Sequence, residues 1–348
     1  MDGVKRVLKN KNAVTLILLA AFYAAVAWML YTGHITRQFT NMLIPMSMYI
    51  VLAVSLNLVV GFLGELNLGH AGFMSVGLFT GCLVSISLAQ KMPLAVRLPM
   101  CMLIGGICAA LFGFAVGMPA LRLKGDYLAS VTLACGEIVK NVITNLEATG
   151  GARGLNTQPI YSSAKTLLPY AVVLVFLTVI VMMHIKKSKQ GRAIMAIRDN
   201  RIAAESIGLN VTYYKLAVFI IAAFFAGAAG ALYGHFFANV KAVSFDYNMS
   251  IEILVIVVLG GMGSVRGSVI AAVVLQALPE IFREFGDYRM LIYAVVLILA
   301  MLLTNSPGLQ GLRSRLDLVS GAREALRKRH VARVMAGSRQ EGGQDHGA

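Results

Sequence analysis

The chain has 348 residues, of which 58% are hydrophobic and 14% charged, and its mean hydropathy is +0.74. These values lie outside the balance of a soluble globular domain. The net charge of +15 comes from basic clusters without the interleaved aromatic residues of single-strand binders, which excludes nucleic acid as a partner. The composition predicts an all-α polytopic protein embedded in a lipid bilayer.

Charge-free runs indicate where the chain crosses the bilayer. A crossing needs about 20 apolar helical residues, because the hydrocarbon core is about 30 Å thick. Such helices are predicted at about 13–32, 42–61, 68–90, 98–119, 127–146, 167–185 and 213–237.

The distribution of basic residues predicts the topology. Lys and Arg gather at the N-terminus, in 186–201 and in the C-terminal tail, so the positive-inside rule places both termini and this loop in the cytoplasm. The number of crossings is then even. Segment 246–279 forms either two short crossings broken at 260–267 or a re-entrant pair, before a last span near 290–304. We expect ten transmembrane helices, with Arg266 at a cytoplasmic turn; eight plus a re-entrant pair is the alternative.

This topology divides the chain into three parts. Residues 1–12 form a cytoplasmic N-terminus, and residues 13–312 form the transmembrane domain with a cytoplasmic loop at 186–211. Residues 313–348 form a basic cytoplasmic tail whose composition is typical of partial disorder.

Two glycine-rich stretches interrupt the apolar pattern, GFLGELNLGHAGF at 61–73 and LGGMGSVRGSV at 259–269. Paired breaks of this kind are typical of transporters with a solute pathway near the bilayer midplane. Ionisable residues in apolar segments are also candidates, because a charge at the bilayer centre costs about 2.5–3.5 kcal/mol. The candidate translocation-pathway residues are Gly64, Glu65, Asn67, His70, Glu137, Glu252, Gly260, Gly261 and Gly263.

Each polar candidate also has a structural interpretation. Glu137 and Lys140 lie three residues apart on one helical face and are expected to neutralise each other. The other polar candidates suit helix ends at the membrane surface. The sequence carries no phosphate-binding loop, hydrolase elbow or metal-ligand spacing. We therefore expect no catalytic residue, metal or cofactor, and no ATP hydrolysis by this chain alone.

Residues 191–210, GRAIMAIRDNRIAAESIGLN, differ from the apolar runs around them. They predict one helix of about 16 residues that starts at Arg192 and is closed by Gly208, too short and too charged to span. Ile194, Ile197, Arg201 and Ala204 fall on one stripe of it. Such a helix is suited to a groove on another protein, although a surface position on lipid is the alternative.

These residues resemble a known family. Ala203-Ala204-x-x-x-Gly208 is similar to the E-A-A-x-x-x-G coupling loop of ABC importer permeases, with Ile202 in place of Glu. Longer stretches resemble the LivM-type permease of branched-chain amino acid importers, over about residues 40–312. They are LNLVVGFLGELNLGHAGFMSVGLFTG at 56–81, GDYLASVTLACGEIVKNVITN with TGGARGL within 125–155, residues 191–234 and residues 250–272.

The resemblance implies a permease subunit in a bacterial inner (plasma) membrane that translocates Leu, Ile and Val. Its implied partners are a second homologous permease, two cytoplasmic ABC ATPases that hydrolyse ATP in trans, and a periplasmic solute-binding protein. The residues expected to couple to the ATPases are Arg192, Ile197, Arg198, Arg201, Ala203, Ala204, Glu205 and Gly208. Urea, amides or other amino acids are alternative solutes. An ion-coupled secondary carrier and a membrane scaffold or receptor are alternative classes.

Overall fold

The computed structural model describes residues 37–282 apart from 122 and 124, together with residues 23, 291, 294–298 and 302. The chain divides into two units, residues 1–284 and 285–348. In the second unit, residues 294–298 are helical. All further description concerns the first unit.

The N-terminus 1–12 and the tail 313–348 lie outside the described residues, as does the span at 13–32 apart from residue 23. About half of the span near 290–304 lies outside them too. The total of ten crossings and the cytoplasmic position of both termini therefore stay predictions.

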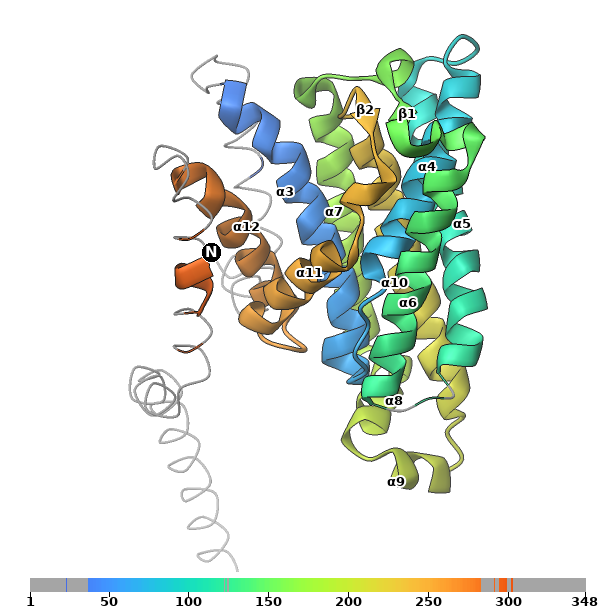
Figure 1. Ribbon diagram of the computed structural model, residues 1–348. Helices are drawn as coiled ribbons and strands as arrows, with labels where there is room; N and C mark the ends of the chain where they lie inside the picture. Colours follow the sequence, from blue (N-terminus) through green and yellow to red (C-terminus); the bar gives the residue numbers. More distant parts are fainter. Residues whose placement is uncertain are drawn as a thin grey trace, which may run out of the picture. The chain divides into compact units, whose positions relative to one another are not determined.

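The described part of the first unit is a bundle of helices (Figure 1). A π-helical segment, η1, continues α3, and short 3-10 turns and two short strands lie in the connections. The helices are α3 (Arg37–Asn57), η1 (Leu58–Leu63), α4 (His70–Leu88), α5 (Leu94–Ala120), α6 (Asp126–Asn145), α7 (Ala164–Lys187), α8 (Lys189–Asp199), α9 (Arg201–Ser206), α10 (Val211–Gly234), α11 (Tyr247–Gly260) and α12 (Val265–Ile281). The short elements are η2 (Glu147–Thr149), η3 (Gly151–Arg153), β1 (Leu155–Asn156), η4 (Gln158–Ile160), β2 (Asn239–Val240) and η5 (Ala242–Ser244).

Six segments of the described chain are long and apolar enough to cross a membrane, which confirms a multi-pass architecture. They are Phe39–Leu63, His70–Leu88, Leu94–Ala120, Ala164–Lys187, Val211–Gly234 and Ala242–Gly260. The predicted span at 127–146 does form a helix, α6, but α6 is not among the six. Its polar side chains lower its hydropathy.

Small residues let the central helices approach closely. A Cβ atom built on Gly77 of α4 would lie 2.2 Å from the Cα atom of Gly227 of α10. A Cβ atom on Gly230 would lie 2.2 Å from the carbonyl oxygen of Met74. Close backbone approach of this kind holds helices together in lipid, where the hydrophobic effect does not.

The two ends of the bundle differ. At one end, β1 and β2 pair antiparallel, with Leu155 opposite Val240 and Asn156 opposite Asn239. At the opposite end α8 and α9 project from the bundle (Figure 1). These ends are called the β1–β2 end and the α9 end below.

The segment predicted to hold either two crossings or a re-entrant pair turns at the α9 end. After β2 and η5 the chain enters α11. The backbone N–H of Tyr247, the first residue of α11, donates a hydrogen bond to the carboxylate of Glu137 in α6. After α11 the turn contacts η1, since the N–H of Gly263 donates to Oδ1 of Asn57 at 2.8 Å. In this stretch only Ala242–Gly260 is among the described segments long and apolar enough to cross a membrane, so two crossings with Arg266 at the turn and a re-entrant pair both stay predictions. α11 has 14 residues and covers only about 21 Å, less than the thickness of the hydrocarbon core.

Candidate functional site

The single helix predicted from Arg192 to Gly208 is wrong, because the chain forms two helices, α8 and α9. Asn200 separates them with an extended backbone, φ −155° and ψ 102°. Its side-chain oxygen accepts the N–H of Ala203 at 3.0 Å and caps α9. Asn favours such caps over helix interiors, because its side chain competes with the backbone for hydrogen bonds.

Gly208 closes this element, as predicted. Its φ is +85°, in the left-handed region that favours glycine. The N–H of Leu209 donates to the carbonyl oxygen of Ala204 at 3.1 Å across this turn. The arrangement satisfies a carbonyl group that the end of α9 would leave without an intrahelical partner.

One side of the α8–α9 pair packs inward and the other is exposed. Ile197 and Ala204, both predicted coupling residues, are 4% and 2% exposed. Ile202 and Ile207 are 77% and 76% exposed. Large apolar side chains on a charged, projecting element indicate an interaction surface. We call this the α9 surface; it consists of Ile202, Ala203, Glu205, Ile207 and Gly208.

The remaining predicted coupling residues are basic. Arg201 Nε donates to Glu205 at 2.8 Å on the exposed side of α9, and Arg192 is exposed on α8. Arg198 reaches the membrane-spanning bundle: its Nη1 donates to the carbonyl oxygen of Gly61 in η1 at 2.9 Å. Its aliphatic part covers Gly64, where an added Cβ would lie 2.5 Å from Arg198 Cγ.

The second glycine-rich break meets the first at the same place. A Cβ on Gly61 would lie 2.2 Å from the backbone nitrogen of Gly263. Lys186, at the end of α7, donates to the carbonyl oxygen of Gly263 at 2.6 Å and lies 5.2 Å from the ring centroid of Phe62. We call the contact of Gly61, Gly64 and Gly263 the glycine junction. Arg198 and Lys186 hold it from the α9 end.

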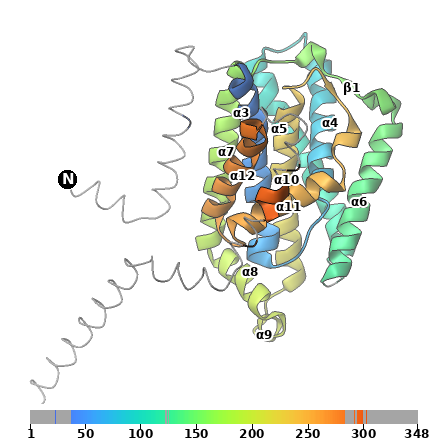
Figure 2. The same ribbon diagram turned by 60° about the vertical axis from the view of Figure 1, so that its left-hand side comes forward.

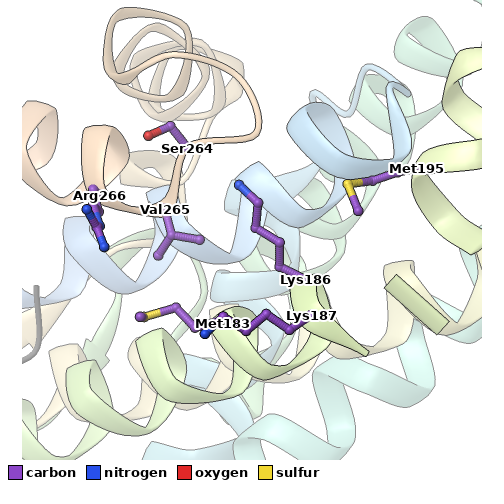
Figure 3. Close-up of a pocket in the computed structure, with 7 residues that line it drawn as sticks. All are labelled: Met183, Lys186, Lys187, Met195, Ser264, Val265 and Arg266. Atoms are coloured by element: carbon purple, nitrogen blue, oxygen red, sulfur yellow. The ribbon is translucent and has the colours of Figure 1, made fainter. Parts of the chain in front are cut away.

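Two cavities flank these contacts. Figure 3 shows Lys186 reaching from α7 toward the turn that carries Ser264. The cavity there, of about 380 Å³, is lined by Met183, Lys186, Lys187, Met195, Ser264, Val265 and Arg266. A second cavity, of about 460 Å³, is lined by η1 and its continuation, by Lys215, and by the α8–α9 connection.

The structure does not bring the predicted pathway residues together into one site. Gly64, Glu65 and Gly263 lie near the α9 end, and Glu65 forms an ion pair with Lys215, whose side chain is 3% exposed. Asn67, in the connection before α4, and His70, the first residue of α4, are fully buried. His70 Nε2 lies 3.0 Å from Ser55 Oγ.

Glu252 and the glycines of the second break have internal contacts. The carboxylate of Glu252 accepts hydrogen bonds from Tyr49 at 2.9 Å and Gln276 at 3.2 Å. A Cβ on Gly260 would lie 2.5 Å from the carbonyl carbon of Gly267, so this glycine lets α11 and α12 meet. Gly261 begins the turn that connects them.

Glu137 of α6 forms the predicted ion pair with Lys140. Its carboxylate also accepts the N–H of Tyr247 at 3.0 Å. The side chains of Lys140 and Glu137 are 18% and 27% exposed. This pair therefore reaches the surface, unlike Asn67 and His70.

Two residues of the junction region were missed in the sequence. Asn57 Oδ1 accepts the N–H of Gly263, and its Nδ2 donates to Ser268 Oγ at 3.0 Å. Lys215, the partner of Glu65, lies just before an apolar run. An amide side chain inside an apolar run indicates an internal polar contact. Asn57 is such a residue and is fully buried, but it is not ionisable and so was not among the predicted site residues.

Apolar helices joined to a charged, projecting helix pair define this protein as a multi-pass membrane protein. Residues 38–303 match the family described as the branched-chain amino acid transport system permease component, and the chain belongs to this family.

Similar proteins include the high-affinity branched-chain amino acid transport system permease protein LivM of Salmonella typhimurium. It is 35% identical, over 88% of this chain and 77% of the relative. LivM of Escherichia coli is 34% identical with the same coverage. The permease LivH of Salmonella typhimurium is 22% identical, over 77% of this chain and 93% of the relative. No solved structure matches the chain significantly.

Proposed function

We propose that the protein is a transmembrane permease subunit of an ATP-driven importer of branched-chain amino acids in a bacterial inner membrane. Family membership and the names of the LivM and LivH relatives support this proposal. Its proposed partners are a second homologous permease, two cytoplasmic ATPases and a periplasmic solute-binding protein. ATP is hydrolysed by the ATPase subunits.

The observation that supports ATP coupling most strongly is the contact between α8 and the glycine junction. The α9 surface is exposed for a partner, while Arg198 on α8 donates to Gly61 and Lys186, just before α8, donates to Gly263. A displacement of the α8–α9 pair therefore acts on both backbone breaks together. In this mechanism ATP binding shifts the equilibrium between two pathway orientations, because the closed ATPase dimer binds one of them better.

The pathway candidates divide into two roles under this proposal. Gly64, Gly260, Gly261 and Gly263 set where the chain bends, and Glu65, Asn67, His70 and Glu252 hold the bent segments through internal contacts. We propose that Glu137, whose side chain is 27% exposed, is the ionisable candidate that meets the solute.

The docking step is tested by crosslinking in the assembled transporter, in a background without the four native cysteines. Ile202→Cys on the exposed α9 surface is expected to capture an ATPase subunit. Ala204→Cys is the matched control, since Ala204 is 2% exposed and is expected to give little capture. If active transporter yields no ATPase crosslink at Ile202→Cys, the docking assignment is wrong.

The energy source and the solute are tested in proteoliposomes that contain all the subunits. Leucine uptake is expected to require internal ATP and the binding protein, and to be inhibited by isoleucine and valine. Uptake that follows an ion gradient without ATP would identify a secondary carrier. Inhibition by urea or acetamide but not by valine would assign another solute.

A further inference from the structure

The exposed side of helix α6 carries polar side chains beside apolar ones such as Ile138 and Val142, whereas the exposed side of α5 is apolar. Figure 2 shows α6 at the edge of the bundle. One side of α6 packs against the bundle through residues such as Leu128, Thr132 and Val139, which are buried. The exposed side chains of its opposite side are Asp126, Tyr127, Ser130, Ala134, Ile138, Asn141, Val142 and Asn145.

The neighbouring helix α5 shows what a lipid-facing surface of this protein looks like. All of α5 is described, and its exposed residues are apolar without exception. They are Ala95, Val96, Pro99, Leu103, Ile107, Leu111, Phe114, Ala115, Met118 and Pro119. Since lipid tails cannot hydrogen-bond to amides or solvate charges, contact with lipid would be costly for Asp126, Asn141 and Asn145 on the exposed side of α6.

The helix α6 is long enough to cross the hydrocarbon core. Its 20 residues extend about 30 Å, the thickness of the hydrocarbon core. α6 also packs against the spanning helix α4, since a Cβ on Gly72 would lie 2.9 Å from Gly136 Cα. Glu137, eleven residues after Asp126, lies about 16 Å along α6, near its middle. The Glu137–Lys140 ion pair is therefore partly exposed about halfway through the bundle.

This pair offers one anion and one cation side by side. Its position is fixed from two elements, since Lys140 lies one turn along α6 and Tyr247 of α11 donates its N–H to the Glu137 carboxylate. Asn141 follows Lys140 on the exposed side. An α-amino acid carries an ammonium and a carboxylate joined through one carbon atom, so it complements such a pair in charge.

We propose that the exposed side of α6 lines the aqueous solute pathway, and that Glu137 and Lys140 bind the ammonium and carboxylate groups of the passing amino acid. The inference rests on the proposed function, because it needs a zwitterionic solute and a pathway. A site that binds only the groups common to all α-amino acids does not distinguish one amino-acid side chain from another. Selection among Leu, Ile and Val is then left to apolar contacts or to the binding protein.

Water access is tested first, in the assembled transporter with the four native cysteines replaced. Asn141→Cys and Ala134→Cys on α6 are compared with Leu111→Cys and Ile107→Cys on the exposed side of α5. A membrane-impermeant thiol reagent is expected to label the α6 positions at least tenfold faster than the α5 positions. Equal, slow labelling at all four would place α6 in lipid. Crosslinking of Ala134→Cys to the second permease, with no labelling, would make this surface a subunit contact. Either result overturns the proposal.

Solute contact is tested by leucine protection of Asn141→Cys during ATP-driven turnover. Glu137→Gln keeps an oxygen that accepts the Tyr247 N–H but removes the charge, so a structural role predicts unchanged protection. Binding by the pair predicts at least a tenfold higher leucine concentration for half-protection, with the unprotected labelling rate unchanged, and recovery in Glu137→Asp. Unchanged half-protection in both Glu137→Gln and Lys140→Gln overturns the solute contact. ATP-driven leucine uptake by the unmodified transporter tests the proposed function separately.

Discussion

The guanidinium group of Arg198 donates a hydrogen bond of 2.9 Å to the carbonyl oxygen of Gly61, which lies 137 positions earlier in the chain. Gly61 is part of η1, where the helix widens before it ends at Gly64. The contact joins a projecting cytoplasmic helix, under the proposed topology, to a backbone break inside the bundle. Removal of this hydrogen bond should therefore impair transport while the ATPase subunits still bind.

Arg198→Ala is expected to reduce ATP-driven leucine uptake at least tenfold, because a hydrogen bond from a charged group contributes about 1.5–3 kcal/mol. ATPase binding should persist, since the α9 surface is untouched. Uptake and ATPase co-purification are measured together, with Lys189→Ala, an exposed substitution on the same helix, as the control. Full uptake in Arg198→Ala would show that the hydrogen bond between Arg198 and Gly61 is not needed for coupling.

Gly61→Ala should destabilise the protein. The added Cβ would lie 1.9 Å from Asn57 Oδ1 and 2.2 Å from the Gly263 nitrogen, so η1 and the α11–α12 turn must separate. Overpacking of this kind costs about 1–3 kcal/mol. Thermal unfolding in detergent is expected to show a lower Tm than for Gly136→Ala, whose Cβ would make an ordinary contact at 3.5 Å. Equal Tm values for the two variants would contradict the close approach at the junction.

Lys215→Met is expected to be more harmful than the double change Lys215→Met with Glu65→Gln. Lys215 is 3% exposed and the Glu65 side chain 15%, so removal of the ammonium leaves a largely buried carboxylate without its partner. Breaking a buried pair costs about 3–5 kcal/mol, whereas replacing both charges is often close to neutral. The Tm values of the unmodified protein, the two single variants and the double variant form a double-mutant cycle, which measures the interaction between Lys215 and Glu65. Additive losses would argue that the pair does not interact.

Gly208→Arg should leave the permease in the membrane but abolish coupling. Nothing lies within 4 Å of a Cβ at this position, so the side chain projects from the α9 surface, and the φ of +85° adds about 1–2 kcal/mol of strain. Gly208→Asn is the control, because Asn tolerates this conformation. We expect leucine uptake to be lost in the first variant and largely kept in the second. Wild-type uptake with Arg would remove Gly208 from the docking surface.

The proposed orientation places the β1–β2 end in the periplasm. A periplasm-dependent reporter such as alkaline phosphatase is expected to be active when inserted at Gly151, in the connection before β1, and inactive when fused after Leu318. The opposite pattern would invert the topology. Activity at both positions would overturn the even number of crossings.

The sequence predicted the helices more fully than their contacts. Long charge-free runs locate α3, α4, α5, α7 and α10 because hydrocarbon thickness sets their length. The break between α8 and α9 was missed, since the helical periodicity continues across Asn200 and only its cap interrupts the backbone.

The meeting of the two glycine breaks depends on tertiary packing. Gly61 and Gly263 lie about 200 residues apart, and no local pattern relates them. The same limit explains why Lys215 was missed: the residue becomes meaningful only when Glu65 lies beside it. Glu137 and Lys140 were paired correctly because helical geometry alone brings residues three apart together.

The antiparallel pairing of β1 with β2 joins the connection before α7 to the connection after α10. β1 precedes α7 and β2 follows α10, and the N–H of Ser162 also donates to the carbonyl oxygen of His235 at 2.9 Å between the same two connections. The ends of α7 and α10 that lie farthest from α9 are thereby fastened to each other. Under the proposed function, a displacement of α9 by an ATPase subunit would then rotate α7 and α10 about the β1–β2 end, so that the movement is largest at the α9 end and smallest near the strands.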